Sequence, residues 1–240
     1  MTDKNLKQIE EELFNLMQSE ISETKFLVDS FVHEHPSEIG KILFTRVKED
    51  AFVQNLFFFP IIFQQVLPHI DDEFYIPTLI EIVKHKKIDH RIRLQTTRLL
   101  GWKRQEAQES IPYLLAYLDG EKDLQQITAI ALAEIGYEKF DELIPTLLVA
   151  MKKGLTYLTR MNAARMLIEN KDNLDKVLPH LISALEEDSD YRFRQKIARY
   201  FGEIKDPSAK KALLKANKSD KHPIVRSVAK TSLDDLEKLK

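Results

Sequence analysis

The sequence predicts an all-α protein, a right-handed α-α superhelix in which helical pairs stack behind a divergent N-terminal helical cap. Prolines recur with similar neighbours at spacings of 35, 33 and 34 residues, at Pro77, Pro112, Pro145 and Pro179. A period of this length is typical of helical-hairpin arrays. The chain of 240 residues holds six glycines and nine prolines, too few for an all-β protein, and is rich in helix-favouring residues.

The predicted organisation is a cap with a degenerate repeat over residues 1–74, followed by about five regular repeats over residues 75–240. Within the cap, Leu6, Ile9, Leu13 and Leu16 share one face of a helix over residues 4–18. A second helix is expected to start near Ser22 and to continue through residues 26–31. We expect this hairpin to cover the apolar end of the array, as terminal caps do. A coiled-coil dimerisation arm is the alternative, although fewer than three heptads are present.

The next pair is predicted from Pro36 to about Lys48 and from about Ala51 to Val66. The latter segment is apolar nearly all round and carries Phe52, Phe57, Phe58, Phe59 and Phe63. Pro60 should kink it, because proline removes a main-chain hydrogen bond and crowds the preceding turn. The segment is interpreted as a core helix, with an exposed aromatic docking patch as the alternative.

Each regular repeat is expected to open at its proline, because a backbone N–H in the first helical turn has no helical partner. Pro207 opens a weaker fifth unit. The second helices are expected to end near Gly101, Gly136, Ile168, Gly202 and Asp234. Small residues at their centres allow close approach within a pair: Thr96, Thr97, Ala131, Ala163, Ala164, Ala198 and Ala229.

The second helices also carry a pattern of an Asp in the turn, an apolar residue followed by Arg, small residues, and a final Gly. Asp190 with Phe193-Arg194, Ala198 and Phe201-Gly202 fits it, as does Asp89 with Ile92-Arg93 and Leu100-Gly101. Val225-Arg226, Ala229 and Leu233 fit without the glycine. Over about residues 75–240 the chain therefore resembles HEAT repeats of the short type first described in phycobilisome lyases. The resemblance implies a helical repeat fold and does not imply lyase activity.

One arginine slot recurs in four repeats, at Arg93, Arg160, Arg194 and Arg226. A ladder of cations for an anionic ligand is one interpretation. The favoured one is that each arginine reaches an acceptor in a neighbouring turn, with Asp89 and Asp190 as candidate acceptors that are also well placed as N-caps.

The opposite side of the second helices is the candidate partner-binding surface. Its predicted slots are Leu94, Gln95, Arg98 and Trp102; Ala129, Ile130, Ala133 and Tyr137; Met161, Asn162, Arg165 and Glu169; Gln195, Lys196, Arg199 and Glu203; and Ser227, Val228, Thr231 and Asp235. The residues expected to bind a partner along a concave face are Arg98, Trp102, Tyr137, Arg165, Lys196 and Arg199. Arginine and aromatic residues are frequent anchors of protein recognition. A solvated charged face is the alternative.

Composition narrows the classes of function. Lysine and arginine number 36 against 38 acids, and cysteine is absent, which excludes disulfides and a cysteine nucleophile. No phosphate-binding glycine loop or Gly-x-Ser-x-Gly elbow occurs, and His33-Glu34-His35 lacks the spacing of a helical zinc site. We therefore expect no catalytic residue, metal or cofactor. The polar N-terminus and the short apolar runs favour a cytoplasmic protein that does not span a membrane.

The function predicted from these patterns is a non-catalytic scaffold or adaptor that binds a protein partner. One alternative is an enzyme or accessory factor similar to the bilin lyases. Another is nucleic-acid binding, because residues 190–231 carry twelve Lys or Arg against four acids. HEAT-like DNA glycosylases are disfavoured because Trp102 is the single tryptophan. The His-Glu pairs of the iron-dependent HEAT hydroxylases do not recur along the repeats.

Overall fold

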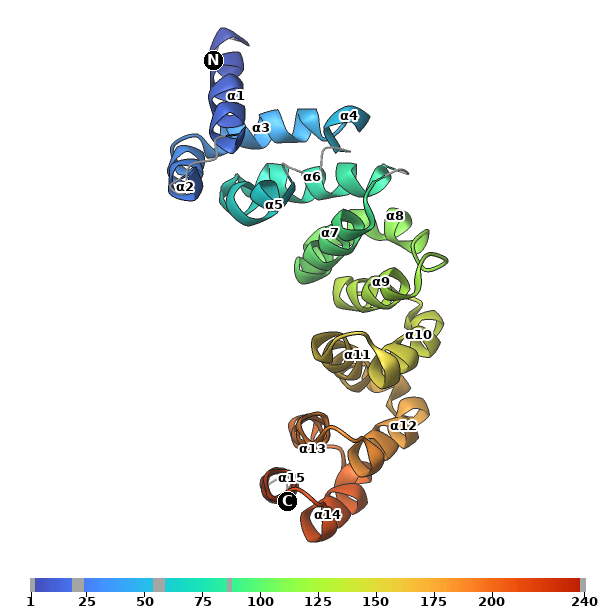
Figure 1. Ribbon diagram of the computed structural model, residues 1–240. Coiled ribbons are helices and arrows are strands. Elements are labelled where there is room, and N and C mark those ends of the chain that lie inside the picture. Colours follow the sequence, from blue (N-terminus) through green and yellow to red (C-terminus); the bar gives the residue numbers. More distant parts are fainter. Residues whose placement is uncertain (1–2, 19–23, 54–58, 86–87, 238–240) are drawn as a thin grey trace. The chain divides into compact units, whose positions relative to one another are not determined.

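The computed structural model describes residues 3–18, 24–53, 59–85 and 88–237 (Figure 1). The described residues are helical or irregular, with no β-strand among them. None of the helices in these ranges is long and apolar enough to cross a membrane. The chain divides into two compact units, unit 1 (Met1–Tyr117) and unit 2 (Leu118–Lys240). The predicted all-α repeat architecture is confirmed, whereas the predicted boundary at residue 74 stays a prediction.

Unit 1 begins with the predicted N-terminal hairpin, and α1 packs against α2 and α3. Ile9 and Leu13 of α1 are buried, as their spacing predicts. The helices of unit 1 are α1 (Asp3–Gln18), α2 (Thr24–Glu34), α3 (Pro36–Arg46), α4 (Asp50–Val53), α5 (Phe59–Ile61), α6 (Asp72–Lys84), α7 (His90–Trp102) and α8 (Ile111–Leu115). Ser22, the predicted start of the second helix, lies outside the described residues.

The segment around Pro60 departs from a regular α-helix. A π-helical turn, Ile62–Val66, follows directly after α5, and a 3₁₀ turn, Leu67–His69, follows that. Proline lacks the N–H that the preceding turn needs, and irregular turns are a common response. Phe52 packs edge-on against Phe14 of α1, with ring centroids 5.8 Å apart, which supports a core role at that position. The side chains of Phe57, Phe58 and Phe59 lie outside the described ones.

Unit 2 consists of two layers of helices. The first helices α10, α12 and α14 pack side by side in one layer, and the second helices α9, α11, α13 and α15 form the other (Figure 1). The helices are α9 (Lys122–Ile135), α10 (Phe140–Lys153), α11 (Tyr157–Glu169), α12 (Leu174–Glu187), α13 (Tyr191–Ile204), α14 (Lys210–Ser219) and α15 (Pro223–Glu237). Between the layers lie fully buried side chains such as Leu147, Leu181, Phe193 and Phe201.

The small residues predicted at the centres of the second helices are buried as expected. α13 packs directly against α15, where Ser232 Oγ donates a hydrogen bond of 2.9 Å to the backbone carbonyl of Ala198. Gly136 ends α9 in the left-handed conformation, with φ of 91°, which glycine adopts without strain. Small side chains therefore set the distance between neighbouring helices of this layer.

The position predicted for the repeat prolines is wrong in three of four cases. Pro77, Pro145 and Pro179 lie inside α6, α10 and α12, each five residues after the first helical residue. Only Pro112 occupies a first turn, and a 3₁₀ helix, Arg104–Ser110, precedes it. The three longer helices start earlier because acidic residues in their first turn favour the positive end of the helix dipole.

Candidate protein-binding surfaces

Two arginines of unit 2 join neighbouring repeats. Arg160 on α11 pairs with Asp188 at the C-terminal end of α12, and Arg194 on α13 pairs with Asp220 at the C-terminal end of α14. Arg226, in the same slot of α15, donates a hydrogen bond of 2.7 Å to the backbone carbonyl of Asp220. The interpretation of this slot as an inter-repeat contact is therefore confirmed for Arg160 and Arg194, whereas Arg226 contacts the turn of its own repeat.

The acids that hold these arginines are not the predicted ones. Asp190 is the N-cap of α13 and accepts a hydrogen bond of 2.9 Å from the Arg192 backbone N–H, so its assignment as the partner of Arg194 is wrong. Asp89 caps α7 in the same way, through the Arg91 backbone N–H at 2.8 Å. A nearby backbone donor satisfies each of these carboxylates.

The residues that sequence reasoning missed are Asp188 and Asp220. Each accepts a hydrogen bond from the backbone N–H two residues later, at Asp190 and His222, at 2.9 and 2.8 Å. Their equivalent positions, three residues before the first residue of the next second helix, are the signal that would have found them. The side chain of Arg192 donates to Asp190, and this contact is the main cause that lowers the pKa of Asp190.

The predicted binding residues Lys196 and Arg199 lie on one face of α13, with Arg192 one turn earlier. Arg199 is exposed and Lys196 is half-buried, with its ammonium 4.7 Å from the centroid of the Tyr200 ring. Neither makes an ion pair with any described residue. These two cations differ from Arg160 and Arg194 because no acid of the described chain neutralises them.

Apolar side chains flank this cationic face. Leu158 of α11 and Ile224 of α15 occupy the repeat slot that Arg192 occupies on α13. They are 55% and 45% exposed, respectively. Because α11 and α15 both pack against α13, these aliphatic groups lie on either side of α13 at the level of Arg192, one turn before Lys196.

The remaining predicted residues of unit 2 are held by acids. Arg165 Nη2 lies 2.5 Å from Glu134 Oε1 on α9, and Arg165 Nη1 lies 3.5 Å from Glu169 Oε2. Tyr137 Oη donates a hydrogen bond of 3.0 Å to Glu142. Arg165 therefore joins α11 to α9 in addition to any role in binding.

The predicted exposure of the second-helix face is wrong for α9. Ala129 and Ile130 are buried, and Ala133 and Tyr137 are partly covered. Their apolar character, unlike the polar residues in the same slots of α13, is the reason. In unit 2 the accessible part of this face is carried by α11, α13 and α15.

Unit 1 carries the other two predicted residues. Trp102 is the last residue of α7 and is 56% exposed, while Arg98 lies one turn earlier and is half-buried. Their spacing of four places them on the same face of α7. Trp102 is a large exposed apolar side chain of the kind that marks protein contacts.

These features define the class of the protein as an α-α helical repeat protein. Residues 144–234 match the family model of HEAT repeats, which confirms the resemblance in that range. No curated protein matches the sequence. Among solved structures, the chain is similar to human deoxyhypusine hydroxylase in complex with glycerol, at 17% sequence identity and a TM-score of 0.29. That match covers 90% of this chain and 99% of the other.

Proposed function

We propose that this protein is a non-catalytic cytoplasmic scaffold that binds a protein partner on the second-helix face of unit 2. The main observation that supports this proposal is that the cations on the second helices fall into two groups, those in ion pairs and those without one. Arg160 and Arg194 form ion pairs between repeats, whereas Lys196 and Arg199 form no ion pair with an acid among the described residues.

The neighbourhood of these cations favours a protein as the partner. Leu158 and Ile224 offer aliphatic surface on both sides of α13, and a partner that covers them gains the free energy of burying apolar area. Arginine close to exposed apolar groups is a common composition for the centre of protein interfaces. A nucleic-acid backbone would use the cations and leave Leu158 and Ile224 in water.

The test is affinity capture from the source organism with the full chain as bait. We expect a partner to be recovered by the wild type and lost, by about tenfold or more, with Lys196→Glu/Arg199→Glu. Lys211→Glu/Lys218→Glu is the matched control, because both lysines are exposed on α14 and the change in net charge is the same. Equal recovery by both variants would contradict the assignment of the α13 face.

The same samples also test the alternative classes. Fluorescent duplex and single-stranded nucleic acids, titrated over a salt series, should show no binding that depends on Lys196 and Arg199. Tight, salt-dependent binding lost in the Lys196→Glu/Arg199→Glu variant would replace the protein partner by a nucleic acid.

A further inference from the structure

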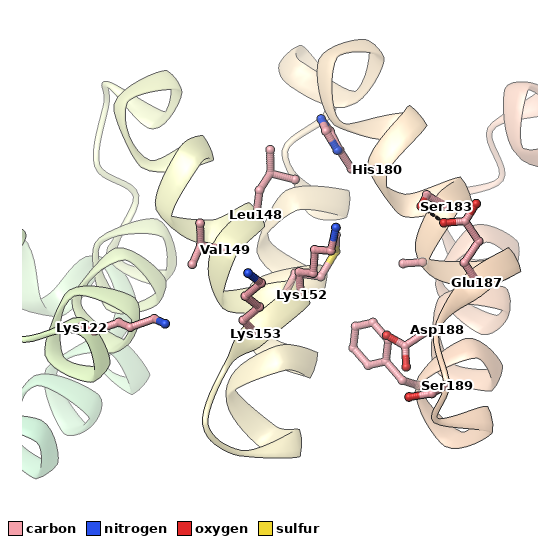
Figure 2. Close-up of a pocket in the computed structure, with 13 residues that line it drawn as sticks. Lys122, Leu148, Val149, Lys152, Lys153, His180, Ser183, Glu187, Asp188 and Ser189 are labelled. Atoms are coloured by element: carbon pink, nitrogen blue, oxygen red, sulfur yellow. Dashed lines mark hydrogen bonds between the residues drawn. The ribbon is translucent and has the colours of Figure 1, made fainter.

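A groove of about 750 Å³ lies on the first-helix layer of unit 2, between α10 and α12 and reaching the start of α9 (Figure 2). Its volume is in the range of small-molecule binding sites. The apolar part of its lining is Leu148, Val149, Met151, Ala184 and Phe193. Val149 is 45% exposed, so apolar surface is open to a ligand at the groove.

Three lysines line the same groove. Figure 2 shows Lys122 projecting from α9 toward α10, and Lys152 on the side of α10 that faces α12. Lys153 follows on the last turn of α10. All three are exposed, and none makes an ion pair with a residue of the described ranges.

The acids on the opposite wall do not neutralise these lysines. Asp188 is held by Arg160 and by the backbone N–H of Asp190. Glu187 accepts a hydrogen bond of 2.9 Å from Ser183 Oγ and leaves one carboxylate charge at the rim. Glu187 is therefore the one lining acid without a cationic partner among the described residues. Three lysines against this single acid give the groove a positive charge.

In the next groove along the layer, between α12 and α14, a lysine is neutralised by an acid of the same groove. Glu186 and Lys215 form an ion pair of 2.5 Å across it, and it measures about 740 Å³. Glu186 follows Lys152 by the same 34 residues that separate Pro145 from Pro179. Lys215 follows Ser183 by the same 32 residues that separate Asp188 from Asp220.

The pair that spans the second groove is thus replaced by Lys152 and Ser183 in the first. The hydroxyl of Ser183 carries no charge, so Lys152 has no counter-ion at this position. In the second groove, the equivalent positions hold the oppositely charged pair Glu186 and Lys215. The α10–α12 groove differs from its neighbour by leaving its cations available, although the two are similar in size.

The chemistry of the groove selects among anionic ligands. Its unpaired cations are lysines, and the guanidinium of Arg160, which contacts lining residues of the groove, is already held by Asp188 and by the Met151 carbonyl at 3.0 Å. Phosphate groups are bound best by bidentate guanidinium groups. A purely anionic ligand would also leave Val149 and Leu148 uncovered. Carboxylates beside a large apolar side chain fit both parts of the lining.

We propose that the α10–α12 groove binds a short acidic segment of a protein partner. One large apolar side chain covers Leu148 and Val149, and neighbouring Asp or Glu side chains pair with Lys122, Lys152 and Lys153. This surface belongs to the layer opposite Lys196 and Arg199. The inference therefore shares with the proposed function only the requirement that the partner is a protein.

The probe is a synthetic fluorescent peptide in which Leu and Phe alternate with Glu and Asp, titrated with the full chain by anisotropy. Two companion peptides carry Lys in place of the acids, or Ser in place of the apolar residues. We expect the first peptide to bind about tenfold or more tightly than either companion, and to weaken as salt is added. Equal affinities for the acidic and basic peptides, or no binding of the acidic peptide, would overturn the proposal.

Substitutions of groove residues test whether the acidic peptide binds in the α10–α12 groove. Lys152→Glu/Lys153→Glu should weaken the acidic peptide by about tenfold or more, and Val149→Ser should weaken it without a change in its salt dependence. Lys211→Glu/Lys218→Glu is the matched control, because both lysines are exposed on the first helix α14 and the change in net charge is the same, and it should have no effect. If the double charge reversal unfolds, Lys152→Gln/Lys153→Gln and Val149→Ser carry the test. Unchanged affinity in both overturns it.

Lys196→Glu/Arg199→Glu separates this inference from the proposed function. We expect that variant to bind the acidic peptide as the wild type does. Loss of peptide binding there, with Lys152→Glu/Lys153→Glu unaffected, would assign the peptide to the second-helix face and contradict the α10–α12 groove.

Discussion

Arg194 and Asp220 form a bidentate ion pair that joins two consecutive repeats. Arg194 Nε donates to Asp220 Oδ2 at 2.8 Å and Nη2 donates to Oδ1 at 2.9 Å. The two side chains are 9% and 5% exposed. Arg194 Nη1 also donates to the Asp188 carbonyl at 2.6 Å, so the guanidinium ties together the turns that end α12 and α14.

Removal of the cation should destabilise unit 2. Arg194→Met keeps much of the apolar stem but leaves the Asp220 carboxylate buried without its partner. We expect a loss of about 3 kcal/mol in the free energy of unfolding, the usual cost of one unpaired charge in a buried pair. The measurement is urea denaturation followed by far-UV circular dichroism, since the single tryptophan, Trp102, lies in unit 1.

The double variant Arg194→Met/Asp220→Asn gives the control. With the buried charge gone as well, it should be more stable than Arg194→Met alone. If the two losses simply add, Arg194 and Asp220 do not interact as the distances indicate.

The same pair predicts how stability depends on pH. The hydrogen bonds from Arg194 are the main cause that lowers the pKa of Asp220 below its usual value. A lowered carboxyl pKa contributes stability that is complete above the unfolded pKa of about 4 and is lost as the pH falls toward the folded pKa. We therefore expect the difference in unfolding free energy between wild type and Asp220→Asn to be constant from neutral pH to about pH 5 and to shrink below about pH 4.

Urea denaturation of both proteins at several pH values checks this sign. Asp190, whose pKa is also lowered, is present in both proteins and cancels in the comparison. A difference that grows as the pH falls would contradict the assignment of Asp220 as the titrating group.

The sequence predicted much of this fold because its signals are local. The ends of most second helices, the buried small residues and the N-caps Asp89 and Asp190 depend on residues within one or two turns. The partner of Arg194 could not be predicted in this way, because Asp190 and Asp220 are both acids in a turn and only the folded chain shows which one the guanidinium reaches. The helix starts predicted from the prolines were wrong for a related reason, because proline is accepted both in a first turn and inside a bent helix.

The candidate site was predicted less completely than the fold. The position of Arg199 on an exposed face follows from helical spacing, and so does that of Lys196. The engagement of Arg165 by Glu134 depends on the packing of α11 against α9, which spacing within one helix does not reveal. The α10–α12 groove was missed because Lys122 comes from a different helix than Lys152 and Lys153.

Gly202 tests the close packing of α13 on α15. A Cβ added at Gly202 would lie 2.6 Å from Ser232 Oγ and 2.8 Å from Ser232 Cβ. In a helix interior alanine is more favourable than glycine by about 1 kcal/mol. Overpacking of this kind costs about 1–3 kcal/mol, which is the larger effect. We expect Gly202→Ala to destabilise, and to cost less in a Ser232→Gly background. A stabilising Gly202→Ala would show that the two helices can separate at no cost.

Arg165 and Arg199 occupy the same slot of neighbouring repeats but should differ in what their loss does. Arg165 pairs with Glu134, whose side chain is 8% exposed, so Arg165→Ala leaves a largely buried carboxylate and should cost about 2 kcal/mol of stability. Arg199 is exposed, and Arg199→Ala should change stability by less than about 0.5 kcal/mol. Denaturation of both variants, and of Arg165→Ala with Glu134→Gln, separates a structural arginine from one available to a partner. Equal losses for the two single variants would contradict that separation, and with it the choice of Arg199 over Arg165 as the residue to mutate in binding experiments.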